Sequence, residues 1–226
     1  MNPSPSIVVF DVNETLSDLT PLRRRFADVG AAEALAATWF AAVLRDGIGL
    51  AAAGAMERFA VIGAHNLRLL LGGLDLDRSL DDAVEHVMSG FLDLPVHPDV
   101  PDGVRALRAA GLRLVTLSNG ATRVAETLLT AAGIRDEFAA LLSVEDAGVW
   151  KPARAAYEYA AQRCGSEASE MVLVAVHPWD TDGAARAGMQ TAWLDRRGVP
   201  YPPYARRPTY TIGSLGELAT TLSRDE

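Results

Sequence analysis

The sequence predicts an α/β fold in which a doubly wound, mostly parallel sheet carries an inserted helical cap. Two observations predict this fold. Short apolar runs alternate with helical segments through most of the 226 residues, and one long stretch near the start has helical periodicity but no strand pattern. Strands that alternate with helices are typical of a parallel sheet covered on both faces, so the expected core is Rossmann-like.

Five apolar runs are the predicted strands of this sheet. The clearest is 6–12, because Ile7 to Phe10 are all apolar, as in a strand buried on both faces. The others are 112–117, 140–144, 171–176 and 191–195. The predicted helices are 100–110, 122–132, 153–164 and 182–187, and a glycine follows each of them, which favours a helix end. A short strand and a helix from Leu215 close the chain.

The stretch from about Leu19 to Leu94 interrupts this alternation. It is rich in Ala, Leu and Arg, and glycines divide it into about four predicted helices: Gly30, Gly47–Gly49, Gly63 and Gly72–Gly73. Pro95 and Pro98 mark the return to the sheet. We therefore expect a helical cap domain at 19–94 and a Rossmann-like catalytic core made of 1–18 and 95–226.

The composition argues against several classes of function. The formal net charge is −8, so nucleic acid or an anionic membrane would repel the chain, whereas a small anionic substrate can still bind in a local cationic pocket. Cys164 is the one cysteine, which leaves no internal disulfide and no cysteine zinc cluster. With no signal-peptide pattern and no apolar window near the length of a membrane span, we expect a cytoplasmic protein.

Polar side chains follow four separate predicted elements. They are Asp11 after the first strand, Ser118 after the second, Lys151 beyond the third and Asp180 after the fourth. Ligands of an open parallel sheet bind beyond the carboxyl ends of its strands, so these side chains are expected to converge there. A single aspartate at a strand end is commonly a turn or helix cap, but capping does not account for all four residues in this order.

Four ordered motifs of this chain resemble those of the haloacid dehalogenase superfamily. They read FDVNETL, TLSNG, WKPARAAYEYA and HPWDTDGAARAG, beginning at Phe10, Thr116, Trp150 and His177. The branch that they resemble most is the type II 2-haloacid dehalogenases. The resemblance covers nearly the whole chain, including an early helical cap, and the set of motifs is specific although each motif alone is weak.

The resemblance implies a role for each of these residues. Asp11 matches the nucleophile that attacks the substrate and forms an ester, and Lys151 would keep Asp11 ionised because a nearby cation lowers the pKa of a carboxylate. Ser118 and Asn119 would orient Asp11 and bind the substrate carboxylate or the departing halide. Asp180 would orient or deprotonate the water that hydrolyses the ester, with capping of a helix that starts near Thr181 as a further role.

The resemblance also separates two chemistries. Phosphatases of the superfamily usually have a second acid two residues after the nucleophile, and another acid five residues before the position of Asp180 that helps to hold magnesium. This chain has Asn13 and Ala175 at these two positions. A halide leaving group needs neither a proton nor a metal, so the two substitutions favour a dehalogenase without metal or cofactor.

Further candidates for substrate binding come from the cap and from the flanks of the motifs. The family commonly has an arginine just after an aromatic residue in the first long cap helix, and this chain has Ala41 after Phe40. Arg45, one helical turn later on the same face, is the candidate replacement, with a solvated surface arginine as the alternative. The other candidates are Asn13, Trp39, Tyr157, His177 and Trp179, and core packing is the alternative for the aromatic ones.

These features predict hydrolytic dehalogenation of short 2-haloalkanoic acids to 2-hydroxy acids, through an aspartyl ester on Asp11. Two alternatives on the same fold stay open: a magnesium-dependent small-molecule phosphatase that tolerates Asn13, and a catalytically silent binding protein. The expected partner is a small haloacid, with no nucleic acid and no membrane. The resemblance also allows a homodimer.

Overall fold

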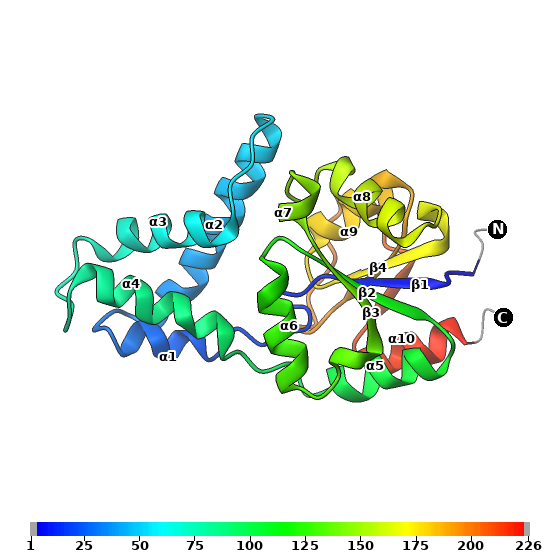
Figure 1. Cartoon of the computed structure of the whole chain (residues 1–226), viewed down its shortest axis with the longest axis horizontal. Helices are drawn as coiled ribbons and strands as arrows, with labels where there is room; N and C mark the ends of the chain where they lie inside the picture. The colour runs from blue at the N-terminus through cyan, green and yellow to red at the C-terminus, as the bar shows by residue number, and fades with distance from the viewer. Residues whose placement is uncertain (1–3, 224–226) are drawn as a thin grey trace.

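A parallel six-stranded sheet forms the centre of the molecule. The computed structural model describes residues 4–223, and within them the strand order is β3-β2-β1-β4-β5-β6 (Figure 1). The strands are β1 (Ile7–Phe10), β2 (Arg113–Ser118), β3 (Phe138–Ser143), β4 (Met171–Ala175), β5 (Gln190–Leu194) and β6 (Tyr210–Ile212). Every neighbouring pair is parallel, which confirms the predicted Rossmann-like sheet.

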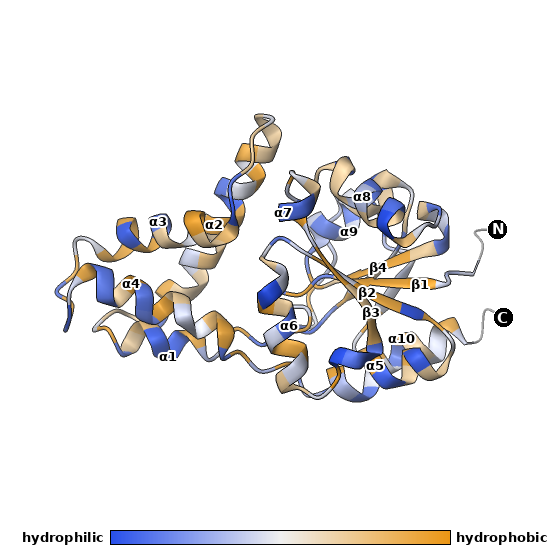
Figure 2. Cartoon of the chain, in the orientation of Figure 1, coloured by the Kyte–Doolittle hydropathy of each residue, from blue (hydrophilic) through white to orange (hydrophobic). Residues whose placement is uncertain are grey.

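Helices cover both faces of this sheet. One face packs against α5 (Val100–Ala109), α6 (Thr122–Ala131) and α10 (Leu215–Leu222), and the other against α8 (Arg154–Cys164) and α9 (Pro178–Ala187). Residues of β1 alternate between the two apolar cores, with Val8 and Phe10 in one and Ile7 and Val9 in the other. The strand β1 is accordingly coloured as hydrophobic in Figure 2. This burial on both faces explains why the predicted strands are continuous apolar runs.

Four α-helices lie between β1 and α5 and stand to one side of the sheet (Figure 1). They are α1 (Leu22–Ala27), α2 (Leu35–Ala52), α3 (Phe59–Leu71) and α4 (Leu80–Ser89), followed by the short 3-10 helix η1 (Gly90–Leu92). We call this segment, residues 19–94, the helical block. Its core is built from aromatic rings, with Trp39 in contact with Phe26, Phe59 and Phe91. The count of helices matches the expectation.

Three of the glycines expected to separate these helices, Gly47, Gly49 and Gly63, lie inside them instead. Gly47 is within α2, where an added Cβ would overlap the ring of Trp150. Gly63 is within α3, and a Cβ there would lie 3.3 Å from the ring of Trp39, whose indole nitrogen also donates to the Gly63 carbonyl. The division at these positions was therefore wrong, and at Gly47 and Gly63 it is close packing, not a chain break, that requires glycine. The turn after α2 contains Gly54, at φ +73°.

The helix α2 also corrects the expectation that no segment approaches a membrane span. By length and composition alone it is long and apolar enough to cross a membrane. Three of its large side chains, Trp39, Phe40 and Val43, are buried against other parts of the protein. A helix packed inside a folded domain passes the same test, so the feature carries little weight for either location.

The two connections between the helical block and the sheet run side by side. The Asp18 amide donates to the Pro95 carbonyl at 2.8 Å, and the His97 amide donates to the Leu16 carbonyl at 2.9 Å. Ser17 and Val96 form an antiparallel bridge between these bonds. The chain thus leaves and re-enters the core through two adjacent antiparallel segments.

Smaller differences from the expected elements concern helix starts. The helix α9 begins at Pro178, four residues before the expected start, because proline is favoured in the first turn of a helix and His177 takes the N-cap position. A short helix that the sequence did not reveal, α7 (Val144–Ala147), follows β3 and is capped by the Ser143 hydroxyl. Two further 3-10 helices are η2 (Arg135–Glu137) and η3 (Ala168–Glu170).

Candidate active site

Asp11 lies at the carboxyl end of β1, the strand in the middle of the sheet, and is only 4% exposed. Its amide donates to the Val174 carbonyl of β4 at 3.0 Å, which fixes its backbone against the neighbouring strand. The Thr15 hydroxyl donates to Asp11 Oδ2 at 2.7 Å and accepts the Val176 amide at 3.1 Å. The carboxylate is therefore held by the loop that follows its own strand and by the end of β4.

Lys151 lies between two carboxylates and is completely buried. Its ammonium donates to Asp11 Oδ1 at 2.9 Å and to Asp180 Oδ2 at 2.6 Å. Charge-assisted hydrogen bonds of this kind compensate for the loss of hydration that a buried ammonium suffers. The three expected residues thus form one ion cluster.

Asp180 is held by donors on both of its carboxylate oxygens. Besides the bond from Lys151 to Oδ2, the Tyr157 hydroxyl donates to Asp180 Oδ1 at 2.7 Å. Asp180 lies in the first turn of α9 and is completely buried, so the expected role as a cap of a helix starting near Thr181 was wrong. Tyr157, on α8, joins the cluster through this bond, whereas the sequence pointed to it as a contact of the substrate.

The surroundings of the two aspartates shift their pKa values in opposite directions. Burial would raise the pKa of Asp11, but the ammonium of Lys151, then His177 and the Thr15 hydroxyl, bring it below its usual value. Burial raises the pKa of Asp180, and the nearby charge of Asp11 raises it further, although Lys151 opposes both. Burial and Asp180 raise the pKa of Tyr157 well above its usual value, so its hydroxyl stays protonated as a donor.

The loop after β2 fixes Lys151 through its backbone. Asn119 Oδ1 accepts the Lys151 amide at 3.0 Å, and Asn119 Nδ2 donates to the Lys151 carbonyl at 3.5 Å. The Ser118 hydroxyl accepts the Gly120 amide at 2.9 Å. Ser118, Asn119 and Asn13 are all buried beside the cluster, and Asn13 Nδ2 faces Gly120. The structure therefore brings Asn119 to Lys151 and not into direct contact with Asp11.

His177 and Trp179 lie at the edge of the cluster. The imidazole is stacked on Trp179, with ring centres 5.1 Å apart, and on Phe40 of α2 at 6.4 Å. Its Nε2 atom lies 4.0 Å from Asp11 Oδ2 and 3.4 Å from Glu14 Oε2. Glu14 has a left-handed backbone, at φ 63°, which is uncommon for a residue other than glycine. The stack of Phe40 on His177 joins the helical block to the edge of the site.

Two expected site residues lie elsewhere. Arg45 pairs with Asp46 at 2.7 Å and its side chain is 70% exposed. It does share a face of α2 with Ala41, but that face lines a cavity between α2 and α3 of about 580 Å³. Trp39 is buried in the aromatic core of the helical block. The structure therefore does not support the expected contact of Arg45 and Trp39 with the substrate site. Helical periodicity shows which residues share a face of a helix, but it does not show what that face contacts.

Three residues of this site were not singled out from the sequence. Thr15 orients Asp11, Glu14 contacts His177, and the Ser143 hydroxyl donates to the Gly120 carbonyl beside Ser118. Thr15 and Glu14 lie within the FDVNETL motif. The composition also points to Lys151 as a site residue, because it is the only lysine among 21 lysines and arginines. Arginine and lysine are not interchangeable where a compact ammonium must fit between two carboxylates.

The fold and this arrangement of carboxylates and lysine define a class of hydrolase with an α/β core. Residues 5–188 match the family described as haloacid dehalogenase-like hydrolase, and the chain belongs to that family. A (S)-2-haloacid dehalogenase of Pseudomonas sp. (strain YL) is 35% identical over 63% of this chain and 60% of its own length. Another (S)-2-haloacid dehalogenase, of Pseudomonas putida, is 29% identical over 95% of each chain.

A solved structure of an L-2-haloacid dehalogenase has the same fold. It superimposes with a TM-score of 0.90 at 28% identity, over 97% of this chain and 99% of that protein. The match to the first relative spans less than two thirds of its length, whereas the matches to the second relative and to this structure span nearly all of theirs. The likeness therefore includes both the sheet and the helical block.

Proposed function

We propose that this protein hydrolyses the carbon–halogen bond of short 2-haloalkanoic acids and releases 2-hydroxy acids. The observation that carries the proposal is Asp11, whose carboxylate is buried at the end of β1 and held by Lys151 and Thr15 with a lowered pKa. A fixed, ionised carboxylate is a competent nucleophile when its target is held beside it. The similarity to named 2-haloacid dehalogenases supports the same chemistry.

The proposed reaction has two steps. An oxygen of Asp11 attacks C2 of the substrate, the carbon–halogen bond breaks with inversion at C2, and the halide leaves with the bonding electrons. Water then attacks Cγ of the Asp11 ester, and the bond between Cγ and the substrate-bearing oxygen breaks. The hydroxyl oxygen of the product therefore comes from Asp11, while Lys151 stabilises the carboxylate before and after the reaction.

We propose that the helical block is a cap that covers this site, with boundaries at 19–94. The paired connections at Asp18–Pro95 and Leu16–His97 support these boundaries, because the chain crosses between the two parts only there. The stack of Phe40 on His177 supports the covering role. An apolar cover excludes water from the first step, in which an anion displaces a halide. Ser118, Asn13 and Trp179 are the proposed contacts of the substrate at the core side.

A single turnover in heavy-oxygen water tests the covalent step. With enzyme in excess over 2-chloropropionate, the 2-hydroxy acid should contain no heavy oxygen, and the peptide that contains Asp11 should gain one heavy oxygen. The reason is that solvent oxygen enters the aspartate when the ester is hydrolysed. Labelled product with an unlabelled Asp11 peptide would show that water attacks C2 directly, and would overturn the proposal.

Chelation tests the proposed independence from metal. Lys151 already supplies the positive charge between the two carboxylates. Halide release from 2-chloropropionate should therefore be unchanged after dialysis against EDTA. Loss of turnover in EDTA that added magnesium restores would contradict this proposal and favour the phosphatase alternative. A cytoplasmic location, the absence of nucleic-acid and membrane partners, and a homodimer stay predictions from the sequence.

A further inference from the structure

The ester step of the proposed reaction needs a group that accepts a proton from water. Asp180 is completely buried, and each of its oxygens already accepts a short hydrogen bond, from Lys151 at 2.6 Å and from Tyr157 at 2.7 Å. These bonds make it an anchor for the lysine. Within residues 4–223, the basic side chains that come within 4.0 Å of the Asp11 carboxylate are Lys151 and His177. Lys151 is protonated and bonded to both aspartates, which leaves His177.

The position of His177 suits a proton acceptor. Its Nε2 atom faces Asp11 Oδ2 at 4.0 Å, so a water molecule attacking the ester carbon can lie within hydrogen-bond reach of the same nitrogen. Stacking on Trp179 and Phe40 fixes the plane of the ring. Glu14 Oε2, 3.4 Å from the same nitrogen, would stabilise the imidazolium that forms. Both neighbours of Nε2 are therefore carboxylates of the loop that follows β1.

We propose that His177, supported by Glu14, is the general base that deprotonates the water hydrolysing the Asp11 ester. This inference rests on the proposed function and assigns a residue to its second step. Nε2 takes one proton as the water oxygen bonds to Cγ. The tetrahedral intermediate then breaks its bond to the substrate oxygen, and this oxygen receives the proton from the imidazolium. The second water proton leaves as the regenerated Asp11 acid ionises beside Lys151.

The charged groups around His177 are few. Its Nε2 atom lies 4.0 Å from Asp11 Oδ2 and 3.4 Å from Glu14 Oε2. Arg197, which follows β5, also lies near this pair. Burial raises the pKa of Glu14 above its usual value, and Asp11 raises it further, against the opposing charges of His177 and Arg197. Phe40 and Trp179, which cover the two faces, carry no charge.

A cavity beside this pair brings water to Glu14 and His177. Glu14 and His177 line a cavity of about 560 Å³ together with Pro178, Trp193 and Arg197. The cavity is large enough for several water molecules, since one occupies roughly 30 Å³ in the liquid. Water in this cavity can thus reach Glu14 and His177.

The variant His177→Asn separates the two steps of the reaction. Asparagine is a favourable N-cap residue, so α9 should keep its start. Rapid mixing of the whole protein with 2-chloropropionate should give a burst of about one halide per protein and then turnover at least about 100-fold slower than in the unsubstituted protein, the usual contribution of a general base. The mass of the Asp11 peptide should show the accumulated ester. Glu14→Gln should slow the same phase by a smaller factor.

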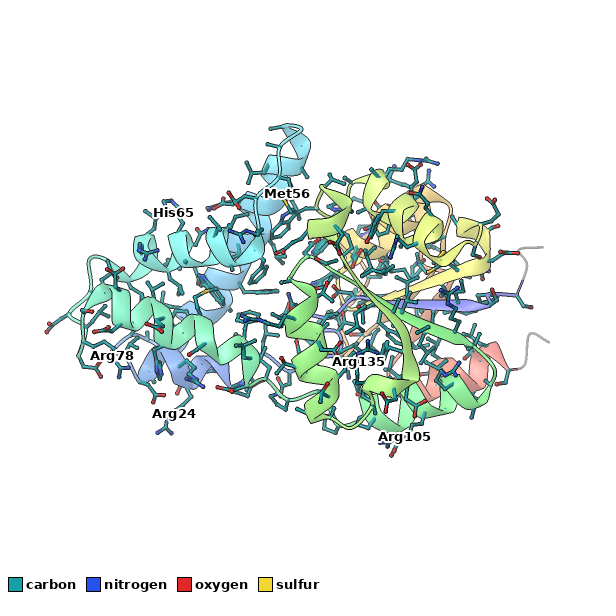
Figure 3. All side chains as sticks on the ribbon, in the orientation of Figure 1. Arg24, Met56, His65, Arg78, Arg105 and Arg135 are labelled. Carbon is teal, nitrogen blue, oxygen red and sulfur yellow. The ribbon has the colours of Figure 1, made fainter. Side chains whose placement is uncertain are left out.

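The matched control is His65→Asn on α3. His65 is exposed and lies on the helical block, where its side chain points away from the sheet (Figure 3). The turnover of His65→Asn should equal that of the unsubstituted protein. A His177→Asn protein that hydrolyses the ester at the normal rate would overturn the inference, as would one that gives no burst, because His177 would then act before the ester forms. Absence of any halide from the unsubstituted protein would instead count against the proposed function.

Discussion

The edge of the sheet and the helical block contribute opposite kinds of side chain to the same site. The sheet edge supplies charge, through Asp11, Lys151 and Asp180, which are bonded to one another and shielded from solvent. The helical block supplies rings, through Phe40 and the aromatic cluster around Phe59. Its charged side chains lie at its surface, as those of Arg24 and Arg78 do at its outer rim (Figure 3).

The difference shows which part of the site has to be rigid. Charges in a buried cluster must keep their partners, because an unpaired buried charge costs several kcal/mol. Strand ends of a parallel sheet hold them in place. Rings tolerate small shifts, since apolar contact has little directional preference. The proposed role of the helical block as a cap requires it to move when substrate enters and product leaves, and contacts between rings permit such movement.

Replacing Asp11, the proposed nucleophile, gives the largest expected effect and tests whether the chemistry belongs to the sheet edge. Asp11→Asn keeps the shape of the side chain but removes the attacking carboxylate. We expect halide release to fall to below about one thousandth of its original rate, while the protein stays folded. Steady-state halide release and circular dichroism measure the two quantities. A folded variant with near-normal turnover would show that Asp11 is not the nucleophile.

Removing the lysine tests the cluster itself. Lys151→Met leaves two buried carboxylates without a cation, so we expect the free energy of unfolding to fall by about 3–5 kcal/mol, together with loss of turnover. Lys151→Arg is the matched variant, because it keeps the charge but places a larger, planar group between the carboxylates. We expect it also to be inactive. Normal activity in the arginine variant would show that positive charge alone suffices.

The pH dependence of stability distinguishes the unsubstituted protein from Lys151→Met. Burial would lower the pKa of Lys151, but Asp11 and Asp180 outweigh it and raise this pKa above its usual value. The stabilisation from the lysine is therefore complete below the usual lysine pKa and is lost as the pH rises through the raised value. In Lys151→Met that alkaline loss should disappear. Denaturant unfolding across the alkaline range measures this loss of stability. An equal loss in both proteins would contradict the stabilising role of Lys151.

Much of this arrangement follows from the sequence, and the reason is topological. Parallel strands end at the same edge, so Asp11, Lys151 and Asp180 could be expected to meet once the strands were recognised. The surroundings of the helices could not be predicted in this way. Gly47 resembled a helix break because the sequence does not show that Trp150 packs against it. The start of α9 was missed because proline can either end a helix or begin one.

The contact between the two regions is tested at Gly47. Gly47→Ala places a methyl group against the ring of Trp150, which adjoins Lys151 and donates from its indole nitrogen to the Glu57 carbonyl of the helical block. We expect the free energy of unfolding to fall by about 1–3 kcal/mol, as overpacking of a core usually costs. Gly49→Ala, two residues later on α2, meets no atom within 4 Å and should instead stabilise by about 0.5–1 kcal/mol. Equal effects at both positions would mean that α2 does not press against Trp150.

The smallest effect is expected at Arg45, and it decides whether the helical block supplies a cation to the site. From the sequence alone Arg45 was the candidate that would hold the substrate anion. In the structure its guanidinium bonds to Asp46 in solvent, on the face of α2 that looks toward α3. Solvent screens an exposed ion pair of this kind, so Arg45→Ala should leave the free energy of unfolding nearly unchanged. KM and kcat for 2-chloropropionate should both stay within about twofold of their original values, well short of the tenfold change that 1.4 kcal/mol of lost binding would produce. A tenfold rise in KM would mean that α2 turns this face toward Asp11 when substrate binds, and the division between a charged sheet edge and an apolar cover would then fail.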